Sequence, residues 1–113
     1  MIHKMKLQPE YYNYILNGTK RIEIRLNDEK RKKIKIGDTI TFLKEPELIE
    51  SFTAKVINLY KFNSFDEMFN SFDISILSDK SMTKDELKNV LEKFYTKEMQ
   101  NEYGVLGIEL KLI

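Results

Sequence analysis

The sequence predicts an α+β domain, built as a small mixed or antiparallel β-barrel of five to six strands with three flanking helices. Five stretches alternate apolar and polar residues as strands do, namely residues 3–7, 20–26, 38–43, 51–62 and 104–113. Three stretches have helical spacing, namely residues 9–17, 64–72 and 83–99. Strand and helix do not alternate regularly, which argues against a doubly wound sheet, and a barrel hides the edges of short strands. We expect residues 1–113 to form a single domain.

Local signals indicate where the helices begin and end. Pro9 suits the first turn of the first helix, and Gly18 suits the position after its end. Ser64 and Thr83 are each followed three residues later by a glutamate, which is the capping-box spacing that opens a helix. In the strand at 51–62, alternation predicts that Tyr60 continues the apolar face of the preceding residues. We expect the apolar last strand to pair on both edges and the first helix to cover one opening of the barrel.

Composition narrows the class of protein. The chain is 42% hydrophobic and 12% aromatic, which excludes a disordered chain, and no apolar run is long enough to predict a membrane span. The absence of cysteine excludes disulfide and thiolate chemistry and leads us to expect a cytoplasmic protein. The single histidine, His3, leaves no histidine pair for zinc, so we expect neither a metal nor another cofactor. We interpret His3 as a strand-end residue rather than a catalytic base.

Charge is balanced over the whole chain but clustered locally. The 19 basic and 18 acidic residues give a formal net charge of +1, which argues against coating of nucleic acid through bulk charge. Basic residues are concentrated between positions 20 and 35, so the remainder of the chain is net acidic. The balanced net charge therefore does not exclude a local basic binding site.

The strand predicted at 20–26 separates apolar from charged residues. One face carries Ile22, Ile24 and Leu26, and the other carries Arg21, Glu23 and Arg25. A carboxylate thus lies between two guanidinium groups, directly after a Gly-Thr-Lys turn. This pattern is typical either of a solvated sheet face or of the wall of an anion-binding pocket.

Three motifs occur in the order found in one known family. They are Gly18-x-Lys20-x-x-Glu23-x-Arg25, Ile36-Gly37-Asp38-x-Ile40-x-Phe42 and the closing "YGVLGIEL" strand. Together they cover nearly the whole chain, and in them the sequence resembles the ASCH domains of the PUA-like superfamily. The resemblance implies a β-barrel with flanking helices and a cleft lined by Lys20, Glu23 and Arg25. It also implies binding of RNA or of a nucleoside or nucleotide, including modified ones.

The chemistry of these three side chains agrees with a binding cleft. Lys20 can offer three ammonium donors, and Arg25 a planar fork suited to phosphate or carboxylate. Glu23 can accept a hydrogen bond from the exocyclic amine of a base, or it can pair with an arginine as a structural ion pair. Residues three apart face opposite sides of a regular strand. We therefore expect Lys20 to lie before the strand, in the turn after Gly18, if it shares a cleft with Glu23.

One bacterial branch of the resembled family suggests an alternative function. Its members are amidohydrolases that remove the acetyl group from acetylcytidine, with a lysine three residues before a threonine nucleophile and a distant glutamate. Lys20 matches that lysine, but Glu23 occupies the nucleophile position, and Asp79 and Lys80 lie where a glutamate is expected. In this alternative Lys20 and Glu23 are the catalytic residues. Lys20 polarises the amide or removes a proton, and Glu23 activates the attacking water. Because Glu23 is close, we predict a charged Lys20 that binds rather than deprotonates.

Lys30, Arg31 and Tyr103 complete the candidate ligand-binding residues. The basic run at 30–33 either contacts phosphates without reading sequence or is a solvated loop. Tyr103 either stacks on a base or closes the barrel core. A third class of function is a protein-interaction module that uses the helix at 83–99. Our first prediction is binding of RNA or a nucleotide, with the amidohydrolase second.

Overall fold

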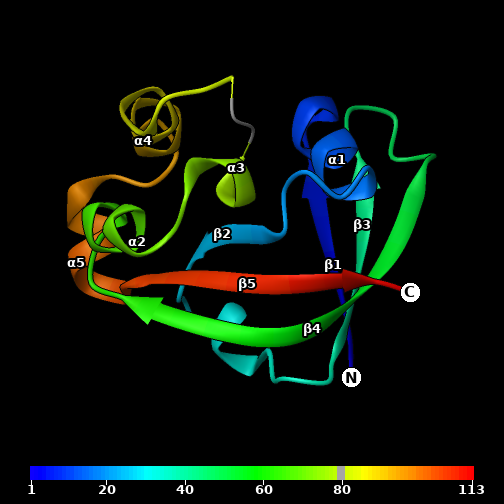
Figure 1. The fold of residues 1–113 in the computed structure, drawn as a ribbon. Coiled ribbons are helices and arrows are strands. Elements are labelled where there is room, and N and C mark those ends of the chain that lie inside the picture. The colour runs from blue at the N-terminus through cyan, green and yellow to red at the C-terminus, as the bar shows by residue number, and fades with distance from the viewer. Residues whose placement is uncertain (79–80) are drawn as a thin grey trace.

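The computed structural model describes residues 1–78 and 81–113, and Asp79 and Lys80 lie outside the described residues. Figure 1 shows the elements in chain order. They are β1 (Ile2–Leu7), α1 (Pro9–Leu16), β2 (Ile22–Leu26), the 3-10 helix η1 (Arg31–Lys33), β3 (Thr39–Lys44), β4 (Ser51–Phe62), α2 (Phe65–Ser71), α3 (Ile74–Leu77), α4 (Lys84–Glu92), α5 (Lys97–Tyr103) and β5 (Val105–Leu112). No helix within the described residues is long and apolar enough to cross a membrane.

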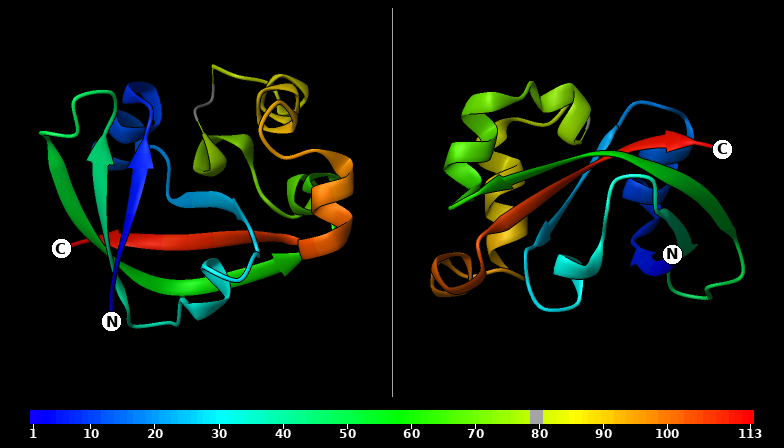
Figure 2. Two further views of the ribbon diagram at one scale, coloured as in Figure 1. Left: turned by 180° about the vertical axis from the view of Figure 1, so that it is seen from behind. Right: turned by 90° about the horizontal axis from the view of Figure 1, so that it is seen from below.

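The five strands form one curled sheet in the order β1-β3-β4-β5-β2 (Figures 1 and 2). β1 and β3 are parallel, and the other neighbours are antiparallel. β5 pairs with both β4 and β2, so the prediction that the last strand is paired on both edges is confirmed. The sheet is an open half-barrel, not a closed barrel, because β1 and β2 are edge strands that are not paired with each other.

Two hydrophobic cores lie on opposite faces of the sheet. The first lies beneath α1, whose Tyr12 and Ile15 pack against strand residues that include Met5, Phe42 and Ile108. The second joins β2 to α2, α3 and α4, and its buried members are Ile22, Ile24, Leu26, Phe65, Met68, Phe69, Leu77, Leu87 and Val105. The apolar face predicted for the strand at 20–26 is thus confirmed, and it packs under the helices.

A β-bulge in β4 allows one strand to serve both cores. The pairing with β5 shifts between Val56 and Asn58. Before the bulge, Val56 packs in the first core, whereas after it Tyr60 packs against the second. The expectation that Tyr60 continues the face of Val56 was therefore wrong, because the extra residue reverses which side chains face each side.

The helices differ from the three that were predicted. Among the described residues there are five α-helices, and the single helix expected at 83–99 is two. The capping box at Thr83 is confirmed, but α4 ends at Glu92, and Thr96 caps α5 by accepting from the Met99 amide. α3 was also missed; its N-cap, Asp73, accepts from the Ser75 amide. The turn between α4 and α5 places Phe94 and Tyr95 beside the cleft described next.

Candidate functional site

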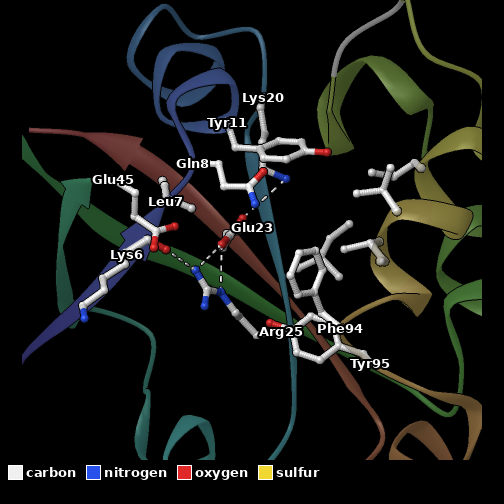
Figure 3. Close-up of a pocket in the computed structure, with 14 residues that line it drawn as sticks. Lys6, Leu7, Gln8, Tyr11, Lys20, Glu23, Arg25, Glu45, Phe94 and Tyr95 are labelled. Atoms are coloured by element: carbon white, nitrogen blue, oxygen red, sulfur yellow. Dashed lines mark hydrogen bonds and ion pairs between the residues drawn. The ribbon is translucent and has the colours of Figure 1, made fainter. Parts of the chain in front are cut away.

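A cleft of 190 Å³ lies at the open side of the half-barrel, between α1, the edges of β1 and β2, and the α4–α5 region (Figure 3). Its polar lining comprises Lys6, Gln8, Lys20, Glu23, Arg25 and Glu45. Its aromatic and aliphatic lining comprises Leu7, Tyr11, Ile24, Leu87, Val90, Leu91, Phe94 and Tyr95. The structure therefore brings together Lys20, Glu23 and Arg25, the three residues of the first motif.

Arg25 spans the gap between the two edge strands. Its Nη2 lies 2.8 Å from Glu23 Oε2 and donates a 2.9 Å hydrogen bond to the Lys6 carbonyl on β1. Its Nε donates to the same Glu23 oxygen at 2.9 Å. A side chain thus connects β1 to β2 where no backbone ladder does, and it fixes the Glu23 carboxylate at the centre of the cleft.

Lys20 reaches the same carboxylate from the turn after α1, as the expectation placed it. Gly18 has a φ of +86°, which favours glycine, and the Lys20 amide then donates to the Tyr14 carbonyl at 2.9 Å. The Lys20 ammonium is buried and donates to the carbonyls of Ile22 (2.7 Å) and Leu77, and it lies 3.5 Å from Glu23 Oε1. Three oxygens therefore surround its three hydrogens.

The environment of the triad sets its charge states. Burial lowers the pKa of Lys20, and the neighbouring Glu23 carboxylate acts against this. Burial alone would raise the pKa of Glu23, but the charges of Arg25 and Lys20 outweigh it and hold that pKa below its ordinary value. Burial would lower the pKa of Arg25, yet Glu23 and Tyr95 keep it raised. Glu23 is thus an ionised carboxylate that is only 5% exposed.

Aromatic side chains form the walls of the cleft. Tyr11 lies on α1, with Lys20 Nζ 5.8 Å from its ring centroid, and Tyr95 lies beside Arg25 on the opposite side. Phe94 is 58% exposed and lines the same cleft. The carboxamide of Gln8 points toward Glu23 and makes no hydrogen bond within the described residues (Figure 3). A planar ring with a polar edge fits this combination of walls and floor.

Several of these lining residues were not predicted from the sequence. Neither Tyr11, in the helix predicted at 9–17, nor Phe94, in the helix predicted at 83–99, was among the candidate site residues. One available signal was Thr96, because threonine is a strong N-cap residue and a new helix there places Phe94 and Tyr95 in a turn. Gln8 and Glu45 come from segments that flank strands and had no local signal.

The other candidate residues lie outside this cleft. η1 contains Arg31, which pairs with Asp28 at 3.1 Å, while Lys30 is exposed and precedes it. Tyr103 packs at the edge of the second core and lines a separate hollow of 480 Å³ near the end of α5. In the view of Figure 1, η1 lies below β4, whereas α1 and α4, which border the cleft, lie above the sheet.

No group of three or more metal-ligating carboxylate, histidine or cysteine side chains occurs within residues 1–78 and 81–113. Among the charged residues that line the cleft, Glu23 is paired with both Lys20 and Arg25. The arrangement suits hydrogen bonding to a ligand through oriented donors and acceptors.

Comparison with known domain families places the chain in one of them. The model of the ASCH domain matches residues 5–113, so the chain belongs to the ASCH domain family, and its half-barrel is consistent with a PUA-like fold. No curated protein matches the chain.

Solved structures extend the comparison. The hypothetical protein PH0355 is 37% identical over 100% of both chains, with a TM-score of 0.88. Protein PF0455 from Pyrococcus furiosus is 34% identical over 100% of this chain and 98% of that one, with a TM-score of 0.80. A mutant of the ZmASCH protein from Zymomonas mobilis is 11% identical over 97% of this chain and 67% of that one, with a TM-score of 0.62, which shows a shared fold alone.

Proposed function

We propose that the protein binds RNA or a nucleotide and holds one base in the cleft lined by Lys20, Glu23 and Arg25. The observation that carries this proposal is the Glu23 carboxylate, which is buried, kept ionised by two cations, and placed at the floor of a cleft with aromatic walls. A buried carboxylate is costly unless it is paired, and once oriented it is a strong hydrogen-bond acceptor.

The two oxygens of Glu23 have different roles. Oε2 accepts both Arg25 contacts, at 2.8 and 2.9 Å. The ion-pair partner of Oε1 is Lys20 Nζ at 3.5 Å, which is longer than the usual charge-assisted hydrogen bond of about 2.7–2.9 Å. Oε1 is therefore the oxygen with capacity to accept from a ligand N–H. The exocyclic amines of cytosine, adenine and guanine offer such a donor.

The charge of the cleft favours a base over a phosphate in its interior. Its inner cations, Lys20 and Arg25, are already paired with Glu23, and the Lys6 side chain points away from them (Figure 3). A phosphate placed there would therefore meet the carboxylates of Glu23 and Glu45 without an unpaired cation between them. A neutral base can instead lie against the aromatic rings of Tyr11, Tyr95 or Phe94 and direct its polar edge toward Glu23. Single-stranded RNA is commonly recognised in this way, through unstacked bases on aromatic side chains.

Replacement of Phe94 by Ala tests the stacking part of the proposal. Stacking of a base on an aromatic side chain is worth about 1–3 kcal/mol, so we expect the Kd for nucleoside monophosphates to rise about 5- to 150-fold. Isothermal titration with the four ribonucleoside monophosphates gives the readout. Because Phe94 is exposed, the fold should persist, which circular dichroism checks.

Ile36→Ala is the matched control, since Ile36 is 62% exposed and lies outside the cleft lining. We expect its Kd values to equal those of the natural sequence. Unaltered affinity in Phe94→Ala, or equal losses in both variants, would count against stacking in this cleft.

The amidohydrolase alternative requires Lys20 to act as a base. Three acceptor oxygens surround its side-chain nitrogen. The charged ammonium has three N–H donors to match them, so the charged form of Lys20 fits the site. We therefore expect acetylcytidine to remain intact when incubated with the natural sequence and to be hydrolysed, if at all, after Glu23→Thr. Chromatography of the nucleoside products is the measurement. Rapid deacetylation by the natural sequence that is lost in Lys20→Met would instead show that the protein is an amidohydrolase.

A further inference from the structure

One face of the sheet is left uncovered over β1, β3 and the first half of β4. Seen from behind in Figure 2, no helix lies in front of β1 and β3, because α1 packs on their other side. Met5 and Leu7 of β1 belong to the core beneath α1. Since side chains alternate along a strand, Lys4 and Lys6 of β1 point to the uncovered face.

Strand register places two more lysines on that face. Ile2 lies opposite Thr39, Thr39 opposite Lys55, and Lys55 opposite Lys111, so these four residues form one row across β1, β3, β4 and β5. We call Lys4, Lys6, Lys55 and Lys111 the lysine face. All four side chains are exposed, and none forms an ion pair with any described residue.

The strand positions between these lysines on β1, β3 and the first half of β4 are neutral. They include the hydroxyls of Thr41 and Thr53, 3.2 Å apart. The nearest strand carboxylate on this face is Glu109 of β5, two residues before Lys111, and it accepts a hydrogen bond from the Tyr60 hydroxyl. Lys55 and Lys111 lie directly opposite each other, an arrangement of like charges that disfavours pairing in a sheet. A bound anion would relieve this repulsion. The neutral positions between the lysines on β1, β3 and residues 51–55 carry no aromatic or acidic side chain, which suits repeated phosphates better than bases or a basic peptide.

The lysine face is continuous with the cleft through β1. The Lys6 carbonyl accepts from Arg25 inside the cleft, whereas the Lys6 side chain points away from Arg25 and Glu23 (Figure 3). Strands lie about 4.8 Å apart and residues on one face about 6.8 Å apart, so the Cα atoms of Lys4 and Lys55 are about 12 Å apart. This span is suited to several successive phosphates and exceeds what a mononucleotide can reach.

We infer that the lysine face binds the phosphate backbone of a single-stranded RNA. One base of this RNA occupies the cleft, and the RNA crosses over β1 between the cleft and the lysine face. This inference rests on the proposed function and adds to it the path of the RNA. Lysines act here as point charges that neutralise phosphates without reading sequence.

The salt dependence of RNA binding tests this path. We would measure binding of a short oligocytidylate by fluorescence anisotropy across a range of salt concentrations for the natural sequence and for Lys55→Ala/Lys111→Ala. Each phosphate contact on a single strand contributes about 0.7 to the log–log slope, so we expect the slope to flatten by up to about 1.4. Binding of cytidine monophosphate in the cleft should be unchanged.

Lys32→Ala/Lys33→Ala is the matched control. It removes the same charge from η1, where Lys32 already lies 3.5 Å from Glu29, and we expect a smaller change in slope. It also tests whether the basic run at 30–33 contacts phosphates. Thermal melts of both double variants check that they fold.

Each other outcome overturns the inference in a distinguishable way. An unchanged slope in Lys55→Ala/Lys111→Ala, with cytidine monophosphate still bound in the cleft, would remove the path and leave the proposed function standing. Equal flattening in both double variants would show an effect of bulk charge alone. If no mononucleotide binds the cleft, the proposed function fails and the shared path with it. An acidic peptide that binds more tightly than the oligocytidylate would assign the face to a protein partner.

Discussion

Replacement of Lys20 by Met is expected to lower the free energy of unfolding by about 3–5 kcal/mol, the cost typical of removing one partner of a buried ion pair. The Lys20 ammonium is 3% exposed and is surrounded by the Ile22 and Leu77 carbonyls and the Glu23 carboxylate. Methionine fills a similar volume but donates no hydrogen bond, so all three oxygens lose this donor. Urea unfolding followed by circular dichroism measures the loss.

Two further variants show whether this loss comes from the buried charge. Lys33→Met changes an exposed lysine in the same way and should cost less than about 0.5 kcal/mol. If Lys20 and Glu23 are coupled, Glu23→Gln should cost less in the Lys20→Met background than in the natural sequence. A Lys20→Met protein as stable as the natural one would mean that the buried ammonium is dispensable for the fold.

Replacement of Glu23 by Gln is expected to weaken nucleotide binding more than any other isosteric change in the cleft. Hydrogen bonds to charged groups are worth about 1.5–3 kcal/mol, so we expect the Kd to rise about 10- to 150-fold for a base that donates to Glu23. Titration calorimetry with cytidine, adenosine and guanosine monophosphates measures it. Uridine monophosphate, whose base has no exocyclic amine, should lose less.

The same variant should alter the response of stability to acid. The pKa of Glu23 is lowered in the folded protein, so its ionised form stabilises the fold above the unfolded pKa of about 4.3, and that contribution is lost as the pH falls through the folded pKa. Glu23→Gln lacks this contribution, so its stability should decline less steeply below about pH 4.3. Glu10→Gln, an exposed change on α1, is the control. Equal affinity and equal acid response in Glu23→Gln and the natural sequence would show that the Glu23 charge contributes neither to binding nor to stability.

Much of the fold was predictable because its signals are local. The strand at 20–26 alternates cleanly, and its apolar residues Ile22, Ile24 and Leu26 pack where that alternation places them. The position of Lys20 in the turn after Gly18 followed from the parity of strand positions alone. The capping residues Ser64 and Thr83 predicted two helix starts correctly.

The rest depended on interactions that a single stretch of sequence does not carry. The bulge next to Val56 is set by how β4 pairs with β5, so the side chain of Tyr60 could not be assigned to a face from alternation. The break between α4 and α5 is stabilised by Gln100, which donates to Glu92 and to the Tyr95 carbonyl. Its side-chain oxygen also accepts from the Phe65 amide at the start of α2, a contact 35 residues away in sequence. As a result, the aromatic wall contributed by Phe94 and Tyr95 emerges only once the two helices are placed.

The site was predictable in its charged centre but not in its surroundings. The resemblance to ASCH domains in the motif that contains Lys20, Glu23 and Arg25 implied a shared cleft. The closing contact of Arg25 with the Lys6 carbonyl joins residues 19 apart in sequence across two unpaired edge strands, and no motif encodes it. Gln8, Tyr11 and Glu45 enter the cleft for the same reason, because the curl of the sheet brings their segments to its open side.

Backbone amide chemical shifts recorded during titration with a ribonucleoside monophosphate test most directly whether the Glu23 cleft is the base-binding site. We expect the shifts to concentrate in residues 20–25 of the turn and β2, in α1 around Tyr11, and in residues 91–95. We also expect them to saturate with the Kd found by calorimetry, and in Glu23→Gln to need about 10- to 150-fold more ligand for saturation. Saturable shifts confined to the hollow beside Tyr103 or to η1, with residues 20–25 unperturbed, would contradict a binding site built on Glu23.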